Sequence, residues 1–366
     1  MPSIKLSPGT TLITSLPLLA LIIVLDILPV GAQSLWQQAD GAGILVGAAV
    51  NPAYLSEPAY ASTLAREFNM LEPEDAMKWT ALRPDENSFD FTLADQLVGF
   101  AQAHTMKVRG HNLLWATHNP KWLSEGHFTP EQLNQLLKQH IHRVVSHYRG
   151  QVFAWDVVNE AFDEHGRLRD SIWYNRPGIG LAANGTAYIE QALRWAREAD
   201  PQALLFYNEA EAETVNAKSD AIYAMARDFK RRGVPLDGIG LQMHVFNLDL
   251  DPASLAANMK RFAKLGLQVQ VTEMDVALPV DASGKLLRSE DLQTQAEIYR
   301  QIAQVCMQNS RCTAFQTWGF TDKYSWIPRF TGWSKGAALL FDKQYQPKPA
   351  YTAVMQALAP ARARKR

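Results

Sequence analysis

Short apolar runs alternate with longer segments of helical periodicity about eight times along the chain, and this alternation restricts the possible folds most strongly. We expect strands at residues 44–49, 69–71, 107–110, 152–158, 204–207, 238–243, 268–271 and 314–318. No linker rich in Ser, Gly or Pro interrupts the pattern, so we expect one domain. Eight strand and helix repeats predict an α/β protein with a single (β/α)8 TIM barrel, whose active site lies at the C-terminal ends of the strands.

Helix signals support this interpretation. The segment that follows Thr129 has a Ser/Thr-type N-cap, Pro130 at the first helical position and Gln132 at the third, which is a typical helix start. Helices are also expected at 216–232 and 292–307. The alternative is a doubly wound open sheet, which usually has a Gly-rich nucleotide turn after its first strand, and residues 46–49 do not form such a turn.

The N-terminal segment is typical of an export signal. Lys5 precedes an apolar run at residues 16–25, and Val30-Gly31-Ala32 resembles a cleavage site. We therefore expect a signal peptide at 1–32, a catalytic domain at 33–361, a basic tail at 362–366, and secretion to the periplasm or outside the cell. The apolar run is shorter than the roughly 20 residues that span a bilayer, although an uncleaved anchor is the alternative. We expect no membrane attachment once the signal is removed.

Charge and cysteine content limit the partners. The chain has 36 Lys and Arg against 37 Asp and Glu, so no net positive charge would attract nucleic acid. Its two cysteines, Cys306 and Cys312, either pair with each other or stay free, and an exported chain favours the disulfide. No cofactor motif is present, and we expect no metal, no cofactor and a monomer.

Two carboxylates follow predicted strands at the end where a barrel places its active site. Glu160 follows the fourth strand and Glu273 follows the seventh. Glycoside hydrolysis requires such a pair, one protonated acid and one ionised carboxylate. The alternative is that each glutamate only accepts a bond from a nearby Lys or Arg. Asn159, which can donate to a sugar hydroxyl, favours the catalytic interpretation.

Residues 109–115, 155–161, 271–275 and 318–326 together resemble glycoside hydrolase family 10, the endo-1,4-β-xylanases. The resemblance extends from residue 44 to about residue 358. It implies a retaining double displacement in which Glu160 is the general acid/base and Glu273 the nucleophile, with carboxyl groups about 5 to 5.5 Å apart. The implied substrate is xylan or a related β-1,4-linked polysaccharide.

The resemblance also implies roles for other residues of the site. His244 would hold the nucleophile with Asp275 as its partner, and Gln242 would contact the acid/base or the sugar. Asn159 would bind the 2-hydroxyl of the sugar under attack. The remaining implied substrate-binding residues are Glu74, Asp75, Lys78, His111, Trp115, Trp318 and Trp326.

The chain also departs from the family pattern. Asp75 stands where the family usually has Asn, and an ionised Asp accepts hydrogen bonds but cannot donate them. Leu241 and residues 116–119 also differ from the usual pattern. These departures leave two alternatives open: a hydrolase of the same mechanism acting on another β-linked glycan, and a non-catalytic carbohydrate-binding protein. Asn208 and Glu209, at the fifth strand end, are expected either to contact substrate or to form a salt bridge.

Overall fold

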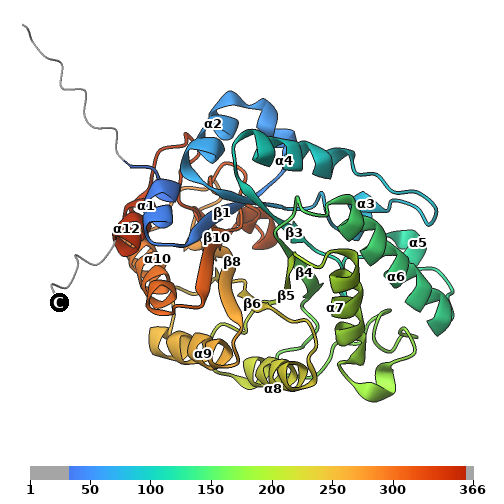
Figure 1. Ribbon diagram of the computed structural model, residues 1–366. Coiled ribbons are helices and arrows are strands. Elements are labelled where there is room, and N and C mark those ends of the chain that lie inside the picture. Colours follow the sequence, from blue (N-terminus) through green and yellow to red (C-terminus); the bar gives the residue numbers. More distant parts are fainter. Residues whose placement is uncertain (1–32, 360–366) are drawn as a thin grey trace, which may run out of the picture. The chain divides into compact units, whose positions relative to one another are not determined.

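A computed structural model describes residues 33–359, and its centre is a ring of eight parallel strands (Figure 1). The strands pair in the order β10-β1-β2-β3-β4-β5-β6-β8, and β10 also pairs with β8, so the sheet closes on itself. The barrel strands are β1 (Leu45–Val50), β2 (Met70–Pro73), β3 (Lys107–His111), β4 (Ala154–Asn159), β5 (Leu204–Glu209), β6 (Gly238–Leu241), β8 (Gln268–Val276) and β10 (Cys312–Thr317). The predicted TIM barrel is confirmed.

Helices surround the barrel and connect successive strands (Figure 1). The α-helices are α1 (Leu35–Gly41), α2 (Pro58–Glu67), α3 (Trp79–Leu82), α4 (Thr92–Ala103), α5 (Lys121–Ser124), α6 (Pro130–His147), α7 (Ala187–Ala199), α8 (Ala217–Arg232), α9 (Pro252–Lys264), α10 (Asp291–Gln308), α11 (Ile327–Phe330) and α12 (Pro349–Leu358). The short 3-10 helices are η1 (Pro52–Ser56) and η2 (Ala182–Asn184). The predicted start of α6 is confirmed, since Thr129 and Gln132 form a capping box.

All eight predicted strands are present, and their ends are shifted. The largest difference is at β8, which runs past residue 271 to Val276. Two pairings extend it: β10 pairs Thr317 with Met274, and β7 (His244–Val245) pairs with Asp275 and Val276. A second small sheet joins β9 (Leu278–Pro279) to β11 (Lys335–Gly336).

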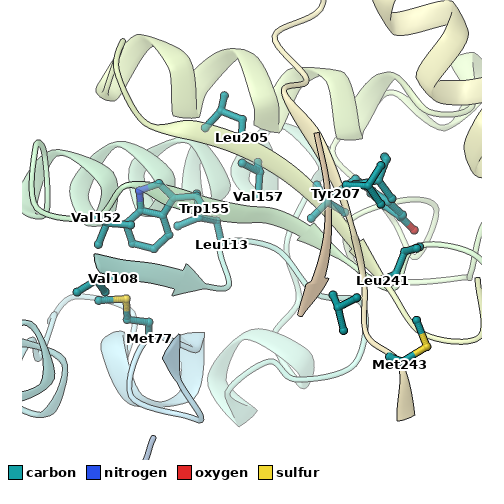
Figure 2. Close-up of a cluster of buried hydrophobic side chains, with 14 of the residues drawn as sticks. Met77, Val108, Leu113, Val152, Trp155, Val157, Leu205, Tyr207, Leu241 and Met243 are labelled. Atoms are coloured by element: carbon teal, nitrogen blue, oxygen red, sulfur yellow. The ribbon is translucent and has the colours of Figure 1, made fainter. Parts of the chain in front are cut away.

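The apolar core lies between the strands and the surrounding helices. Figure 2 shows part of it, with Trp155 and Val157 of β4 beside Leu205 of β5. A Cβ atom at Gly110 would lie 2.2 Å from the Trp155 ring, so glycine is required there for the indole to pack against β3. Truncating a fully buried indole of this kind to Ala costs about 3–5 kcal/mol.

The inside of the barrel is polar. Arg109 of β3 forms a bidentate pair with Asp156 of β4 and donates from Nη1 to Gln270 Oε1 at 2.5 Å. Glu72 Oε2 lies 3.7 Å from the same guanidinium and accepts a bond from Gln316. These side chains are at most 1% exposed. The apolar-run pattern located the strands but did not predict this network.

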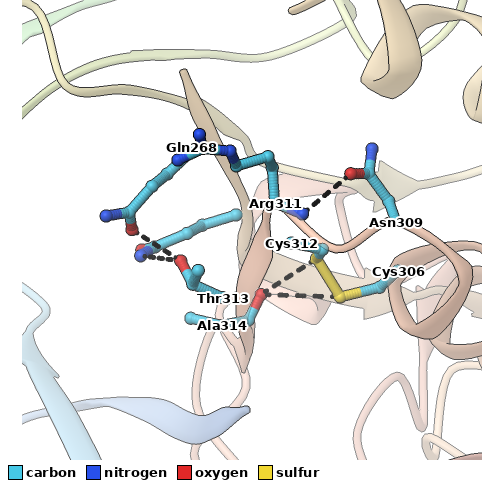
Figure 3. Close-up of a disulfide and its surroundings, with 8 residues drawn as sticks. Gln268, Cys306, Asn309, Arg311, Cys312, Thr313 and Ala314 are labelled. Carbon is cyan, nitrogen blue, oxygen red and sulfur yellow. Dashed lines mark hydrogen bonds between the residues drawn. A yellow bond between two sulfur atoms is a disulfide. The ribbon is translucent and has the colours of Figure 1, made fainter. Parts of the chain in front are cut away.

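Cys306 and Cys312 form a disulfide with an S–S distance of 2.01 Å, which confirms the predicted pairing (Figure 3). Cys306 lies in α10 and Cys312 begins β10, so the bridge closes the turn between them. It lies at the N-terminal end of its strand, the end of the barrel opposite the expected active site.

Several predictions concern residues that the structure does not describe. The predicted signal peptide at 1–32, the domain end at residue 361 and the basic tail at 362–366 all lie outside residues 33–359. Among the helices that the structure does describe, none is long and apolar enough to cross a membrane.

Candidate active site

The predicted catalytic residues lie at the carboxyl ends of the barrel strands. Glu160 directly follows β4, and Glu273 lies in the second half of β8. Asn208 and Glu209 end β5, and Gln242 directly follows β6. Because parallel strands bring their carboxyl ends to one face, side chains from four strands meet there.

Glu273 is held by charged and polar partners. Its carboxylate lies 3.2 Å from His244 Nε2 and accepts a bond from Asn208 Nδ2 at 2.6 Å. His244 Nδ1 lies 3.1 Å from Asp275 Oδ2, so the imidazole bridges two carboxylates. The side chain of Trp326 donates to the same Asp275 oxygen at 2.8 Å. His244 thus contacts Glu273 and Asp275 together, and the roles of His244 and Asp275 in the reaction stay predictions.

The charges of this group are fixed by their contacts. Burial by itself lowers the pKa of His244, but the carboxylates of Asp275 and Glu273 outweigh it and raise that pKa well above its usual value. Burial likewise raises the pKa of Glu273, but the hydrogen bond from His244 and the nearby imidazoles outweigh it and the net pKa is lowered. Glu273 is therefore ionised over a wide pH range, as a nucleophile requires.

Glu160 has a different setting. Its carboxylate accepts bonds from Gln242 Nε2 at 3.0 Å and from Trp115 Nε1 at 3.1 Å. Its backbone φ is 53°, a left-handed conformation that a non-glycine residue adopts only when its surroundings impose it. Trp115 was expected to bind substrate, and its hydrogen bond to Glu160 was not predicted.

A buried group beneath Glu160 holds this turn. The Tyr207 hydroxyl accepts a bond from Ala161 N at 2.9 Å and donates to Glu209 Oε2 at 2.5 Å. Glu209 also accepts from Phe162 N at 3.3 Å and lies 3.1 Å from Lys218 Nζ. Burial raises the pKa of Glu209 to about 7. The salt-bridge interpretation of Glu209 is therefore confirmed, and Tyr207 and Lys218 join the site although the sequence analysis did not name them.

Three amide side chains connect the carboxylates of Glu160 and Glu273. Asn208 Nδ2 donates to Asn159 Oδ1 at 3.0 Å as well as to Glu273. Gln242 Nε2 donates to Asn159 Oδ1 at 3.2 Å as well as to Glu160. Both amides thus engage the Asn159 oxygen, and no acceptor within residues 33–359 is bonded to its Nδ2. That donor is available to a substrate hydroxyl, and the role of Asn159 toward the sugar stays a prediction.

Gly240 makes room for this chain of amides. A Cβ atom at Gly240 would lie 2.2 Å from Asn208 Oδ1. The same oxygen accepts a bond from Thr272 Oγ1 at 2.7 Å, which fixes the orientation of the amide and leaves its nitrogen to donate. Asn208 therefore contacts and positions both Asn159 and Glu273.

Aromatic and basic side chains stand beside the carboxylates. Lys78 Nζ lies 5.2 Å from the ring centre of Trp115 and 5.4 Å from that of Trp318. His118 stacks on Trp115 at 4.0 Å, so one face of the indole is covered by the loop that departs from the family pattern. His111 lies 5.3 Å from Trp318. The structure brings these predicted substrate-binding residues together, and their contacts with substrate stay predictions.

His111 has internal partners that the sequence did not predict. Its Nδ1 lies 3.0 Å from Asp156 Oδ2 and 3.2 Å from Glu72 Oε1, and its Nε2 faces Asn112 Nδ2 at 3.1 Å. The ring thus connects the polar network inside the barrel to the residues at the C-terminal ends of the strands. Burial raises the pKa of Glu72 well above its usual value, and the charge of Asp156 adds to the rise.

Glu74 and Asp75 lie at the end of β2, near Lys78. Asp75 Oδ1 accepts a bond from Lys78 Nζ at 2.8 Å, and its side chain is 67% exposed. Burial raises the pKa of Glu74 to about 7, and the neighbouring Asp75 carboxyl contributes to the rise. An Asn at position 75 would leave Lys78 without this anionic partner, so the departure from the family changes the charge presented to a sugar.

One cluster has the composition of a metal site. Ligand atoms of Glu72, His111 and Glu273 lie within 4.8 Å of one another. Arg109 lies 3.7 Å from Glu72, and its positive charge in the same enclosed space opposes binding of a second cation. Glu273 and His111 also have protein partners already, so the donor set does not fit a metal ion well.

The family model described as Glycosyl hydrolase family 10 matches residues 34–357. The chain is 42% identical to endo-1,4-β-xylanase B of Thermotoga neapolitana over 347 residues, which cover 93% of this chain and 96% of that protein. It is 35% identical to an endo-1,4-β-xylanase of Agaricus bisporus over 337 residues, which cover 91% and 97%.

Solved structures give the same result. Xylanase 10B from Thermotoga petrophila RKU-1, solved in complex with xylobiose, superposes with a TM-score of 0.83 at 43% identity and covers 89% of this chain and 97% of its own. Native xylanase 10B from Thermotoga maritima superposes with a TM-score of 0.83 at 44% identity and covers 89% and 98%.

Proposed function

The chain belongs to glycosyl hydrolase family 10, and from that premise we propose that it is a retaining endo-1,4-β-xylanase, which cleaves internal β-1,4 linkages of xylan by double displacement. We assign the roles from the different surroundings of two carboxylates at strand ends, Glu273 and Glu160. Glu273 is kept ionised by the hydrogen bond from His244, whereas Glu160 sits on a turn beside an indole and an amide. This difference supports Glu273 as nucleophile and Glu160 as acid/base.

The proposed reaction has two steps. In the first, a Glu273 oxygen attacks the anomeric carbon, and the glycosidic C–O bond breaks as Glu160 gives its proton to the leaving oxygen. In the second, Glu160 takes a proton from water, the water oxygen attacks the same carbon, and the bond to Glu273 breaks. Two inversions at one carbon give net retention.

The residues around the carboxylates have proposed roles in the same reaction. The free Nδ2 of Asn159 would donate to the sugar 2-hydroxyl, and this bond strengthens as positive charge develops in the ring. Lys78 and His111 would clamp the same sugar between Trp115 and Trp318, with Trp326 beside the nucleophile. Glu74 and Asp75 would meet the next glycone sugar. No step requires a cofactor.

The test is a proton NMR time course of residues 33–366 acting on soluble xylan. The β-anomer of the new reducing end should appear first, because double displacement retains the configuration. Early appearance of the α-anomer would contradict the role of Glu273. If xylan gives no product and another β-linked glycan does, that glycan is the substrate. Asp75→Asn would then be the first variant to test on xylan.

We also propose that residues 1–32 are removed on export and that the mature enzyme acts outside the cytoplasm as a monomer. The disulfide supports export, because such bonds persist in oxidising compartments. Mass spectrometry of the protein recovered outside the cytoplasm should show a chain that begins at Gln33. Light scattering during gel filtration should give the mass of one chain.

A further inference from the structure

Two exposed aromatic residues, Phe330 and Trp333, take no part in the reaction described above. Each of them is 64% exposed. The other large apolar side chains that are exposed within residues 33–359 are aliphatic and lie on other segments of the chain. Aromatic side chains carry a large apolar surface, and a cluster of them in contact with water is typical of a binding surface.

Phe330 connects this surface to the active site. Its ring centre lies 4.6 Å from that of Trp326, whose Nε1 donates to Asp275 Oδ2 at 2.8 Å. The Trp326 ring also lies 5.1 Å from the ring of His244, which contacts Glu273. Trp326 is half-buried and Phe330 is exposed, so the aromatic contacts continue outward from the side chains that hold Glu273.

The backbone holds Trp333 in an unusual conformation. Its φ is 66°, in the left-handed region that a bulky residue rarely adopts. Hydrogen bonds fix the loop on both sides, because Trp333 N donates to Pro328 O at 2.7 Å and Val280 N donates to Ser334 O at 3.1 Å. Backbone strain persists only where the surrounding structure imposes it, and it is concentrated at functional sites. The loop therefore keeps an indole exposed at a position where glycine would be less strained.

The size and chemistry of this surface favour a sugar as its ligand. Two aromatic side chains with this exposure present roughly 200–300 Å² of apolar area, well below the roughly 800 Å² that each partner of a stable protein interface buries. A pyranose ring has a flat face of C–H groups that fits an area of this size. Arg329, next to Phe330, is exposed, and its guanidinium is a donor for sugar hydroxyls.

We propose that Phe330 and Trp333 form an additional sugar-binding surface outside the reaction site, which stacks on a xylose unit of the same polysaccharide chain. The inference rests on the proposed function, and it adds a contact that only long substrates reach. A chain already held in the active site presents its further sugars to this surface at a high effective concentration. A weak stacking contact therefore strengthens binding of the polymer.

The test compares a long and a short substrate. Xylohexaose extends beyond the reaction site, whereas an aryl xylobioside supplies only two sugars. Trp333→Gly removes the indole and suits the positive φ, so the variant should fold. We expect kcat/KM on xylohexaose to fall about fivefold, mainly through KM, and kcat/KM on the aryl xylobioside to stay within about twofold. Trp333→Phe keeps an aromatic face and should recover most of the loss.

Two further variants and a binding measurement complete the test. Phe330→Leu keeps an apolar side chain against Trp326 but loses the aromatic face, and it should show the same dependence on substrate length. The matched control is Leu93→Ala, which truncates an apolar residue of α4 that is 50% exposed and should affect neither substrate. Calorimetric titration of xylohexaose into Glu273→Ala, with and without Trp333→Gly, should show about fivefold weaker binding in the double variant, without relying on turnover.

The outcomes separate this inference from the proposed function. Equal losses on both substrates, or no loss on xylohexaose, would overturn the sugar-binding role of Trp333. Hydrolysis of the aryl xylobioside by the wild type tests the proposed function separately, and its absence would overturn both proposals. Light scattering tests another occupant: a wild-type dimer that Trp333→Gly dissociates would mean that this surface binds a second copy of the chain and would overturn the inference.

Discussion

The two proposed catalytic carboxylates, Glu273 and Glu160, are held in opposite ways. Glu273 lies within a regular strand, is 5% exposed and is fixed by side chains that contact the carboxylate itself. Glu160 lies just beyond a strand on a left-handed turn, and much of what holds it acts on the backbone of the next two residues. The first arrangement fixes a charge, and the second fixes a position.

The proposed roles, Glu273 as nucleophile and Glu160 as acid/base, explain this difference. A nucleophile has to remain ionised throughout, so its protein partners are a protonated imidazole and an amide donor. An acid/base has to change its protonation state twice in each cycle, so fixed charges directly on its carboxylate would hinder one of the two steps. Support through the backbone, from Tyr207 and Glu209, positions Glu160 without fixing its charge.

The largest expected effect is that of Glu273→Ala. We expect kcat to fall about 10⁵-fold on xylan and equally on aryl xylobiosides, because no covalent intermediate forms on either. Initial-rate measurements on both substrates test this. A small external anion such as azide should restore turnover with inverted configuration, and recovery with retained configuration would contradict the assignment.

Glu160→Ala should separate the two substrates. On xylan we expect a loss of about 10³-fold, since the leaving sugar oxygen needs a proton. On an aryl xylobioside with an acidic phenol, the burst of phenol should persist, because that leaving group departs without protonation. Stopped-flow absorbance of the phenol gives the rate of the first step. Equal losses of that rate on both substrate types would show that Glu160 does not act as the acid.

His244→Ala should change the pH dependence. Burial of Glu273 would persist while the hydrogen bond from His244 is lost, so the pKa of Glu273 should rise. Activity requires the ionised form, and the acidic limb of kcat/KM should move to higher pH by about one unit. The pH profile of kcat/KM on a soluble substrate measures this. Asp275→Asn should cause a smaller shift in the same direction. An acidic limb that does not move in either variant would contradict the proposal that His244 and Asp275 keep Glu273 ionised.

The sequence predicts the barrel and the two carboxylates because both signals are local. Apolar runs alternate with helical periodicity, and Glu160 and Glu273 interrupt apolar runs where packing requires no charge. The partners of Asn208 could not be predicted in this way. Asn208 contacts Asn159 because the two are register partners on β5 and β4, and the register depends on how the whole sheet closes. The contacts of Arg109 inside the barrel were not predicted, because a strand that is buried on both faces does not reveal which of its side chains line the barrel interior.

Tyr207→Phe tests the support of the acid/base through the backbone. Removal of the hydroxyl leaves Ala161 N and Glu209 without their shared partner, so we expect about 1–2 kcal/mol lower stability and about a tenfold lower kcat on xylan. The loss should be smaller for the phenol burst of an aryl xylobioside. The matched control is Tyr299→Phe, which removes a buried hydroxyl that donates to Ala338 O. This variant should be less stable and keep its activity. Equal activity losses in both variants would mean that Tyr207 has only a structural role.

The smallest expected effect on activity comes from the other end of the barrel. Replacing both Cys306 and Cys312 with Ala opens a loop with a sequence separation of 6, and the chain-entropy relation gives a loss of about 2 kcal/mol in the free energy of unfolding. Both carboxylates are held by contacts at the opposite strand ends, so kcat on xylan should stay within about twofold of the wild type. Denaturant unfolding and steady-state rates measure the two quantities. A large loss of kcat at a temperature where the variant remains folded would show that a change at the N-terminal end of β10 is transmitted along β10 and β8 to Glu273. The position of Glu273 would then depend on more than its immediate partners.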